Sequence, residues 1–243
     1  MTIRARLIYN PSSGREEMRR NLPDILDRLE QGGFETSCHQ TNGDGDAAVA
    51  AAEAVRRGFD VVIAAGGDGT IYEVVNGLAE QDSRPHLGIL PAGTTNDLAR
   101  ALGIPRQWDQ AVDIIIRQHA EAIDIGRCEM QEKTKYFINI AGGGLLTELT
   151  YEVPSKLKTV LGQLAYYMKG IEKLPWLRPI QVRMEAEDSI LNAEIMLFFL
   201  TNSNSVAGFE KLAPEASLSD GLFDLIVLRK CNLADFIRLA TMA

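Results

Sequence analysis

The sequence has few cysteines and no long apolar run, and both shortages exclude classes of protein. Cys38, Cys128 and Cys231 stand far apart, so they fit neither the spacing of a zinc site nor a disulfide framework. So small a number is typical of a reducing compartment, and we expect a cytoplasmic protein. The longest apolar run, Ile195–Leu200, has the length of a strand and falls short of the ~20 residues of a membrane span.

Positive charge is also scarce. The 25 lysines and arginines are outnumbered by 33 aspartates and glutamates, which gives a net charge of -8. That balance argues against a nucleic-acid partner, which a broad basic face would bind. The 243 residues are 46% hydrophobic, which is enough for a buried core in one large domain or two small ones.

The first half of the sequence alternates apolar runs with helical patterns. Buried strands are expected at Ala5–Tyr9, Asp60–Ala65 and His86–Gly93, each followed by a turn and a helical pattern. This alternation is typical of a parallel sheet with crossover helices. The first domain is therefore expected to have an α/β fold.

The pattern changes after residue 125. Strand-like segments such as Lys135–Gly144 and Ile180–Glu187 then predominate, interrupted by a helical stretch at Pro154–Leu174. An amphipathic helix is expected at Asn232–Ala243, with no strand after it. We therefore predict an α/β domain over residues 1–125 and a mainly β domain, incomplete at its C-terminal end, over residues 126–243.

Three polar, turn-rich loops follow the expected parallel strands. They are "NPSSG" at Asn10–Gly14, "GGDGT" at Gly66–Thr70 and "PAGTTND" at Pro91–Asp97. Ligands of such sheets bind beyond the carboxyl ends of the strands, where all three loops would meet. The sequence therefore predicts one binding cleft lined by these loops.

The segment Gly66–Thr70 allows two interpretations. It can be a strand-to-helix turn in which Asp68 or Thr70 caps the helix. It can also bind a phosphate through glycine N–H groups and a helix N-terminus, although it lacks the third glycine of the dinucleotide fingerprint and the lysine of a P-loop. In the second case Asp68, with Asp97 facing it, would hold Mg²⁺ rather than touch the phosphate, because like charges repel.

Two further segments also leave alternatives open. The helical pattern that carries Lys156, Lys158, Lys169 and Lys173 is either a solvated helix face or a patch for anionic lipid. The loop around Asp220 is either a solvated loop or a site for a hard cation that uses this carboxylate with backbone carbonyls.

Several segments together resemble one family. In order, "IYNPSSG", "GGDGTIYEVVNGL", "GILPAGTTNDLARALGIP", "FINIAGGG" and "GFEKLAPEASLSDGLFDL" are similar to the soluble bacterial diacylglycerol kinases. The likeness spans nearly the whole chain, and "EVPSKLKTVLGQLAYYMKG" narrows it toward the enzymes of Gram-positive bacteria. "GGDGT" alone is less specific, since NAD kinases carry a similar loop.

The resemblance implies a fold and an activity. It implies a nucleotide-binding α/β domain, a lipid-binding β-sandwich domain and a cleft between them. It also implies Mg²⁺-dependent transfer of the γ-phosphate of ATP to diacylglycerol, which yields phosphatidic acid in membrane phospholipid metabolism. The expected partners are therefore the diacylglycerol substrate and, peripherally, the membrane surface, and a homodimer is an open alternative.

The resemblance assigns roles to residues at matching positions. The catalytic magnesium network corresponds to Asp68, Asp97 and Asp124. The positions that match the ATP-binding loops are Asn10, Pro11, Ser12, Ser13, Gly14, Thr41, Gly67, Asp68, Gly69, Thr70, Ile71, Tyr72, Glu73 and Thr94.

The resemblance also implies a second, structural Mg²⁺ site. That site corresponds to the carboxylate of Asp220 with the backbone oxygens of Ser217 and Leu222.

Two departures from the family pattern bear on activity. Tyr72 stands where the family usually has asparagine, and its phenol would either crowd the nucleotide or point away. The family's general base is a glutamate in a C-terminal "DGE" motif, which this sequence lacks, so we expect the C-terminal end to be missing. A missing base would cost about 10²–10⁴-fold in rate.

The alternative functions are an NAD kinase-like or other small-molecule kinase, and a truncated nucleotide-binding protein without turnover.

Overall fold

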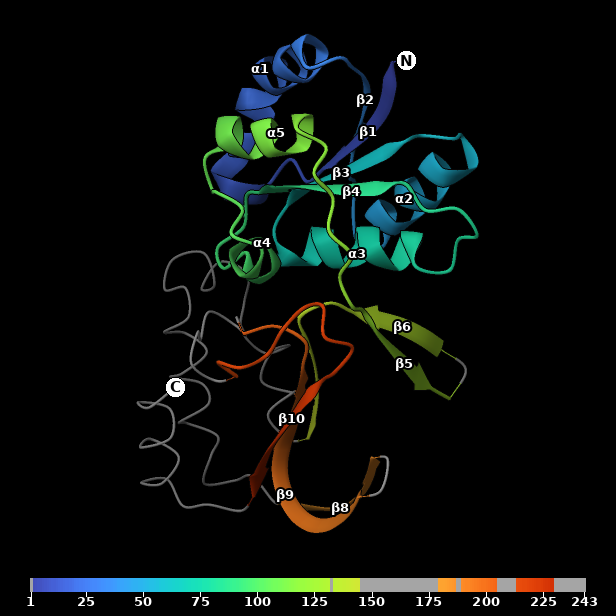
Figure 1. The fold of residues 1–243 in the computed structure, drawn as a ribbon, viewed down its shortest axis with the longest axis vertical. Helices are drawn as coiled ribbons and strands as arrows, with labels where there is room; N and C mark the ends of the chain where they lie inside the picture. The colour runs from blue at the N-terminus through green and yellow to red at the C-terminus, as the bar shows by residue number, and fades with distance from the viewer. Residues whose placement is uncertain (1, 132, 145–178, 187–188, 205–212, 230–243) are drawn as a thin grey trace. The chain divides into compact units, whose positions relative to one another are not determined.

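The chain folds into two compact units, which divide between Ile138 and Asn139 in a computed structural model. Figure 1 shows the elements of each unit. No helix among the described residues is long and apolar enough to cross a membrane. The residues that the structure describes are 2–131, 133–144, 179–186, 189–204 and 213–229.

A four-stranded parallel sheet forms the centre of the first unit. Its strands are β1 (Ile3–Tyr9), β2 (Phe34–Gln40), β3 (Val61–Gly66) and β4 (His86–Pro91), in the order β2-β1-β3-β4. All residues of β3 are buried, as a continuous run of Val, Ile, Ala and Gly predicts for a central parallel strand. The strands and the parallel sheet expected from the sequence are confirmed.

Helices cover both faces of this sheet (Figure 1). α1 (Glu17–Gln31), which follows a 3₁₀ turn at Ser13–Glu16, packs beside α5 (Trp108–Ile116) on one face. α2 (Asp46–Arg56) and α3 (Asp68–Leu78) pack together on the other. The short helix α4 (Asp97–Ala101) follows β4. This layered arrangement leaves the loops at the strand ends open to a ligand.

Alternation along the strands divides the core into two layers, because successive side chains of a strand point to opposite faces. Each fully buried Leu or Ile side chain stabilises the fold by about 1.5–3 kcal/mol. The layer under α1 and α5 contains Ala5, Leu7 and Tyr9 of β1, Ile63 and Ala65 of β3, Ile25 and Leu29 of α1, and Ala111 and Val112 of α5.

An antiparallel hairpin closes the first unit. It consists of β5 (Gly126–Met130) and β6 (Lys133–Phe137). Asn76 of α3 donates from Nδ2 to the Tyr136 carbonyl and accepts the Tyr136 amide at Oδ1, both at 2.9 Å. The hairpin is thus tied to α3, while a domain boundary at residue 125 stays a prediction.

The described part of the second unit is an antiparallel sheet. The long strand β9 (Ser189–Thr201) pairs with β7 (Ile140–Gly144), β8 (Ile180–Ala186) and β10 (Asp224–Arg229). The expected mainly β character of this region is confirmed. The helices predicted at residues 154–174 and 232–243 lie outside the described residues.

One expected strand is divided in two. The sequence predicted a single strand over Lys135–Gly144, but Phe137 pairs with Gly126 of β5 whereas Ile140 pairs with Thr201 of β9. The prediction of one continuous strand is wrong because the chain changes its pairing partner between these two positions. Periodicity along a sequence carries no information about such a change.

An ion pair joins the two helices on the α1 face. Arg28 donates from Nε and Nη2 to the two carboxylate oxygens of Asp113, each at 2.7 Å. These hydrogen bonds hold the pKa of the Asp113 carboxyl below its usual value. A lowered pKa stabilises the folded protein above the unfolded-state pKa, and this contribution is lost as pH falls through the folded-state pKa.

We therefore expect Asp113→Asn to lower the thermal unfolding midpoint at neutral pH and to bring it level with the wild type near pH 2. Circular dichroism melts between pH 2 and pH 8 measure this. Asp24→Asn, which removes an exposed carboxylate from α1, is the matched control and should leave the midpoint nearly unchanged. An Asp113→Asn deficit of the same size at every pH would contradict the assignment.

Candidate functional site

A cavity opens at the carboxyl edge of the parallel sheet. In the sheet order β2-β1-β3-β4, the chain leaves β1 toward β2 on one side and leaves β3 toward β4 on the other. The connections therefore diverge between β1 and β3. Open α/β sheets bind ligands outside the carboxyl ends of such a strand pair. The cavity has a volume of about 400 Å³ and is lined by seven of the predicted ATP-loop residues, Asn10, Pro11, Ser12, Thr41, Gly69, Thr70 and Glu73. Its other lining residues are Asn42, Gly43, Asp44 and Ala47.

The loop after β1 is shaped by Asn10. Its amide donates to the Ala65 carbonyl of β3 at 3.1 Å, and its side-chain oxygen accepts the amide and the hydroxyl of Ser12 at 3.0 and 2.8 Å. Ser13 donates its amide to the Asn10 carbonyl, and Gly14 has a φ of 58°. Asn10 and Ser12 line the cavity, whereas Ser13 and Gly14 begin the 3₁₀ turn and are not part of the lining.

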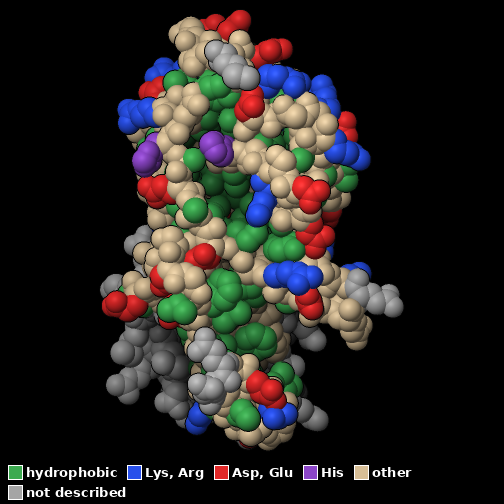
Figure 2. Space-filling model, turned by 45° about the vertical axis from the view of Figure 1, so that its right-hand side comes forward, with side chains coloured by type: hydrophobic (Ala, Val, Ile, Leu, Met, Phe, Trp, Pro, Cys, Tyr) green, Lys and Arg blue, Asp and Glu red, His purple; other side chains and the backbone are tan. Residues whose placement is uncertain are grey.

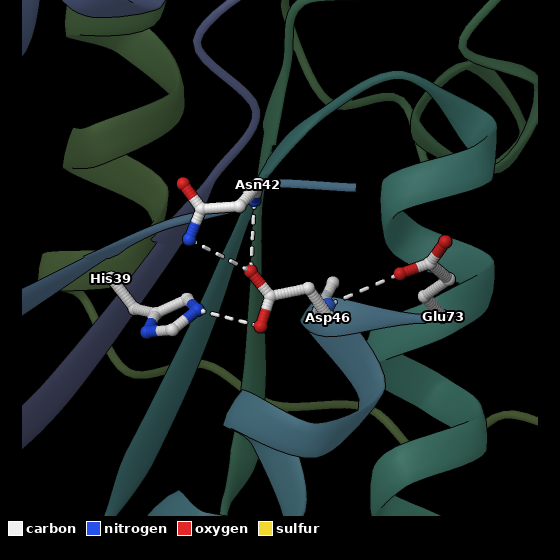
Figure 3. Close-up of polar contacts among 5 residues, drawn as sticks. His39, Asn42, Asp46 and Glu73 are labelled. Atoms are coloured by element: carbon white, nitrogen blue, oxygen red, sulfur yellow. Dashed lines mark hydrogen bonds and ion pairs between the residues drawn. The ribbon is translucent and has the colours of Figure 1, made fainter. Parts of the chain in front are cut away.

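The loop after β2 supplies a second wall. Thr41 donates its amide to the Tyr9 carbonyl at 2.9 Å, which holds the loop against β1. Figure 3 shows His39 and Asn42 directed toward the carboxylate of Asp46 at the start of α2. The Asn42 amide, and secondly the His39 ring, hold the pKa of the Asp46 carboxyl below its usual value.

The start of α3 supplies the third wall. Gly67 is the N-cap in an extended conformation, and its carbonyl accepts the amides of Thr70 and Ile71 at 3.0 and 3.2 Å. The amides of Asp68 and Gly69 have no acceptor within the helix, as in every helical first turn. Gly69 lines the cavity. This helix terminus therefore offers N–H donors and a partial positive charge to an anion.

The carboxylate of Asp68 is fixed by the next loop. Oδ2 accepts the Thr95 hydroxyl at 2.8 Å and the Asn96 amide at 2.9 Å, and Oδ1 accepts the Asp97 amide at 2.7 Å. Asp68 therefore does not cap its own helix, so that interpretation of the sequence is wrong. It joins the start of α3 to the loop between β4 and α4.

These two loops touch through glycine. A Cβ atom added to Gly93 would lie 2.5 Å from the Gly67 Cα, which real side chains do not tolerate. Asn96, 2% exposed and left-handed with a φ of 53°, exchanges hydrogen bonds with the Gly93 amide and carbonyl at 2.7 and 2.9 Å. The glycines thus serve loop-to-loop packing as well as access for a ligand.

Seven of the fourteen predicted nucleotide residues do not line the cavity, namely Ser13, Gly14, Gly67, Asp68, Ile71, Tyr72 and Thr94. Ile71 is 1% exposed in the core, so its side chain packs rather than binds. Tyr72 is 39% exposed and, like the exposed Thr94, lies outside the cavity lining. The Tyr72 side chain therefore lies outside this cavity, and its effect on a nucleotide stays a prediction.

The predicted metal ligands are less closely grouped. Within the described residues, no three His, Cys, Asp or Glu side chains are arranged to hold a metal ion, so Asp68, Asp97 and Asp124 do not form a cage. Asp97 is 8% exposed, and Asp124 lies in the irregular segment before β5. In the second unit, Asp220 accepts the Leu222 amide at 3.0 Å within an exposed turn.

Sequence reasoning missed the residues that hold the loops in place. The sequence marked Thr95 and Asn96 only as members of the polar loop "PAGTTND", yet they bind Asp68 and Gly93. Arg106 donates from Nη2 to the Gly93 carbonyl at 2.9 Å, and no motif marks it. Only the density of Thr and Asn in "GTTND" could have drawn attention to the first two.

On the face that Figure 2 shows, basic and acidic side chains are interspersed. Among the described residues on that face, lysines and arginines form no broad field.

Comparison with known proteins identifies relatives of both units. Residues 4–128 match the family described as the diacylglycerol kinase catalytic domain, and residues 149–242 match the YegS C-terminal NAD kinase beta sandwich-like domain. The chain is 62% identical over 241 residues to a diacylglycerol kinase of Bacillus subtilis, which covers 99% of this chain and 78% of the relative. It is 50% identical over 243 residues to one from Staphylococcus aureus, which covers 100% of this chain and 76% of the relative.

A solved structure has the same fold. The crystal structure of a diacylglycerol kinase from Bacillus anthracis superposes with a TM-score of 0.80 at 27% sequence identity. The superposition covers 99% of this chain and 78% of that one.

Proposed function

Because this chain belongs to the diacylglycerol kinase family, we propose that it transfers the γ-phosphate of ATP to the free hydroxyl of diacylglycerol. The products are ADP and phosphatidic acid. The observation that carries the proposal is the cavity at the β1/β3 edge, which brings three separate predicted ATP loops to one place. Phosphoryl transfer depends mainly on positioning and charge neutralisation, which such a cavity supplies.

The polyphosphate is proposed to lie at the end of the cavity formed by Ser12 and the start of α3. The amides of Asp68 and Gly69 are unpaired donors of the helix terminus there. A Cβ atom added to Gly69 would have no neighbour within 4 Å, so the backbone is open to the phosphate oxygens. Base and ribose would then extend toward Thr41 and Glu73, which line the same cavity.

Mg²⁺ is proposed to arrive with the nucleotide. The ion is usually held by one or two carboxylates together with substrate phosphates and waters, so it needs no cage of three side chains. Three hydrogen bonds leave about one acceptor position on the Asp68 carboxylate, which suits contact through water. Asp97 and Asp124 are proposed to complete this magnesium network, and bound Mg²⁺ would neutralise charge on the transferred phosphoryl group.

A separate structural Mg²⁺ at Asp220, with Ser217 and Leu222, is also proposed.

In the proposed reaction, the lipid hydroxyl oxygen bonds to the γ-phosphorus as the bond to the ADP oxygen breaks. The hydroxyl proton passes to a general base, which the family resemblance assigns to a glutamate of a "DGE" motif absent from this sequence. Because the proposed acceptor is a lipid, the protein is proposed to work in the cytoplasm at the membrane surface. The lysines proposed to contact the membrane lie outside the described residues, and a homodimer stays a prediction.

The full-length gene product should therefore transfer labelled phosphate from γ-labelled ATP into an organic-extractable lipid when diacylglycerol is supplied in mixed micelles. Removing Mg²⁺ with EDTA should abolish the transfer, and excess Mg²⁺ should restore it, because the triphosphate needs its charge neutralised. Label appearing in NAD, with none in the lipid, would instead favour the NAD kinase-like alternative. ATP binding without any labelled product would favour a nucleotide-binding protein without turnover.

A further inference from the structure

The loop between β2 and α2 forms one wall of the cavity, and side chains outside the loop must hold it in place. The loop from Thr41 to Gly45 contains two glycines, and Gly45 has a φ of 83°. Glycine-containing segments have many alternative conformations, and fixing each residue costs conformational entropy. Thr41, Asn42, Gly43 and Asp44 all line the cavity, so whatever holds this loop also sets the shape of the cavity.

The carboxylate of Asp46, directly after this loop, contacts residues at the other end of the loop. Oδ2 accepts the Asn42 amide at 2.8 Å and the Asn42 side-chain nitrogen at 3.4 Å. Oδ1 lies 3.2 Å from Nε2 of His39, the last residue but one of β2. One carboxylate therefore connects β2, the loop and the first turn of α2 (Figure 3).

Glu73 supports the same corner from the opposite side. Its Oε2 accepts the amide of Ala47 at 3.1 Å, so a residue of α3 caps the start of α2 (Figure 3). That cap is needed because the N-cap residue, Gly45, has no side chain to offer. The loop is thereby fixed relative to the helix that begins with "GGDGT".

The charged side chains near the loop between β2 and α2 indicate which part of a nucleotide binds there. Asp44 and Glu73 line the cavity here with Asp46 behind them, and like charges repel a polyphosphate. The lining also includes Gly69 at the start of α3 and Ser12 of the loop after β1, which offer a helix terminus and a hydroxyl. Carboxylates can instead accept hydrogen bonds from ribose hydroxyls or from an exocyclic amine.

We propose that Asp46 is a positioning residue that fixes the wall of the cavity against which the nucleoside part of ATP binds. The proposal rests on the proposed function, because it takes the ligand to be ATP. Asp46 does not line the cavity and acts only through Asn42 and its neighbours.

Isothermal titration of ATP and of tripolyphosphate, each with Mg²⁺, tests this in the full-length protein. Asp46→Ala should weaken ATP binding about tenfold, the effect of losing one or two hydrogen bonds to a charged acceptor, and should leave tripolyphosphate binding unchanged. Asp46→Asn keeps an acceptor for the Asn42 amide, so its affinity for ATP should be intermediate. Asp109→Ala, which removes a first-turn carboxylate from α5, is the matched control and should bind both ligands like the wild type.

The outcomes separate this inference from the function on which it rests. A wild-type protein that binds no ATP would overturn the proposed function and, with it, this role for Asp46. A wild-type protein that binds ATP, with Asp46→Ala equally tight, would overturn the positioning role alone. Equal weakening of ATP and tripolyphosphate binding would also overturn it, because a general loosening of the unit would affect both ligands. If Asp46→Ala does not fold, Asp46→Asn decides between the same outcomes.

Discussion

Replacing Asp68 by alanine is expected to lower the rate of phosphoryl transfer by about two to three orders of magnitude. The carboxylate is proposed to hold Mg²⁺ through water, and a preorganised charge of this kind cannot be replaced by solvent. Its orientation is set by donors from Thr95, Asn96 and Asp97, so the charge is fixed before the nucleotide arrives. Steady-state assay of the full-length protein with saturating ATP measures the loss.

The same substitution also affects stability, and the two effects must be separated. The amides of Asn96 and Asp97 belong to residues that are 2% and 8% exposed, so losing their acceptor should cost about 1–3 kcal/mol of unfolding free energy. Thr95→Val is the matched control, since it removes one donor and keeps the carboxylate. It should reduce the rate less than tenfold, because one neutral hydrogen bond contributes about 1 kcal/mol. A folded Asp68→Ala protein with more than half of the wild-type rate would contradict the proposed role.

Two glycines of α3 are expected to respond to alanine with opposite signs. A Cβ atom on Gly77 would lie 2.2 Å from the carbonyl oxygen of Ala48 and 2.9 Å from the Cβ of Ala51, both in α2. Backbone atoms cannot move aside as a flexible side chain can, so α2 and α3 would have to separate. We expect Gly77→Ala to lower the free energy of unfolding by about 1–3 kcal/mol, the usual cost of overpacking.

Gly69→Ala is the matched comparison on the same helix. An added Cβ would meet nothing within 4 Å, so the apo protein should gain up to about 1 kcal/mol from better helix propensity. The methyl group would, however, stand beside the amide proposed to bind phosphate, so ATP affinity should fall. Urea unfolding of both variants, with nucleotide titration of Gly69→Ala, measures these changes. Stabilisation by Gly77→Ala would show that the two helices do not pack as described.

The sequence predicted where the binding loops lie because that information is local. Apolar periodicity marked β1, β3 and β4, and glycine with small polar residues marked the turns after them. Parallel strands place their carboxyl ends at one edge, so a cavity at this edge followed from the order of the elements. The prediction that the loop at Pro91–Asp97 lines it is wrong, because the loop after β2 forms that part of the lining instead. Local sequence likewise sets the end of α2, since Gly58, directly after its C-cap Arg57, has a φ of 65°, the left-handed conformation that terminates a helix.

The partners of individual side chains were not predictable in this way. Asp68 binds residues more than 25 positions away, and Glu73 caps a helix that begins 27 positions earlier. Such pairings depend on the angle and distance between packed helices, which periodicity does not record. Gly67, a predicted nucleotide-binding position, proved to pack against Gly93 of the next loop.

The sequence by itself therefore determined the class of fold, the family and the edge of the sheet at which a ligand would bind. Local propensities and strand order are sufficient for these, since each is written into contiguous residues. Only the tertiary structure decided that Asp68 spans two loops and that Asp46 supports a cavity wall it does not line. Those roles arise when segments distant in the chain come within hydrogen-bonding distance, because a hydrogen bond requires its atoms to be about 3 Å apart.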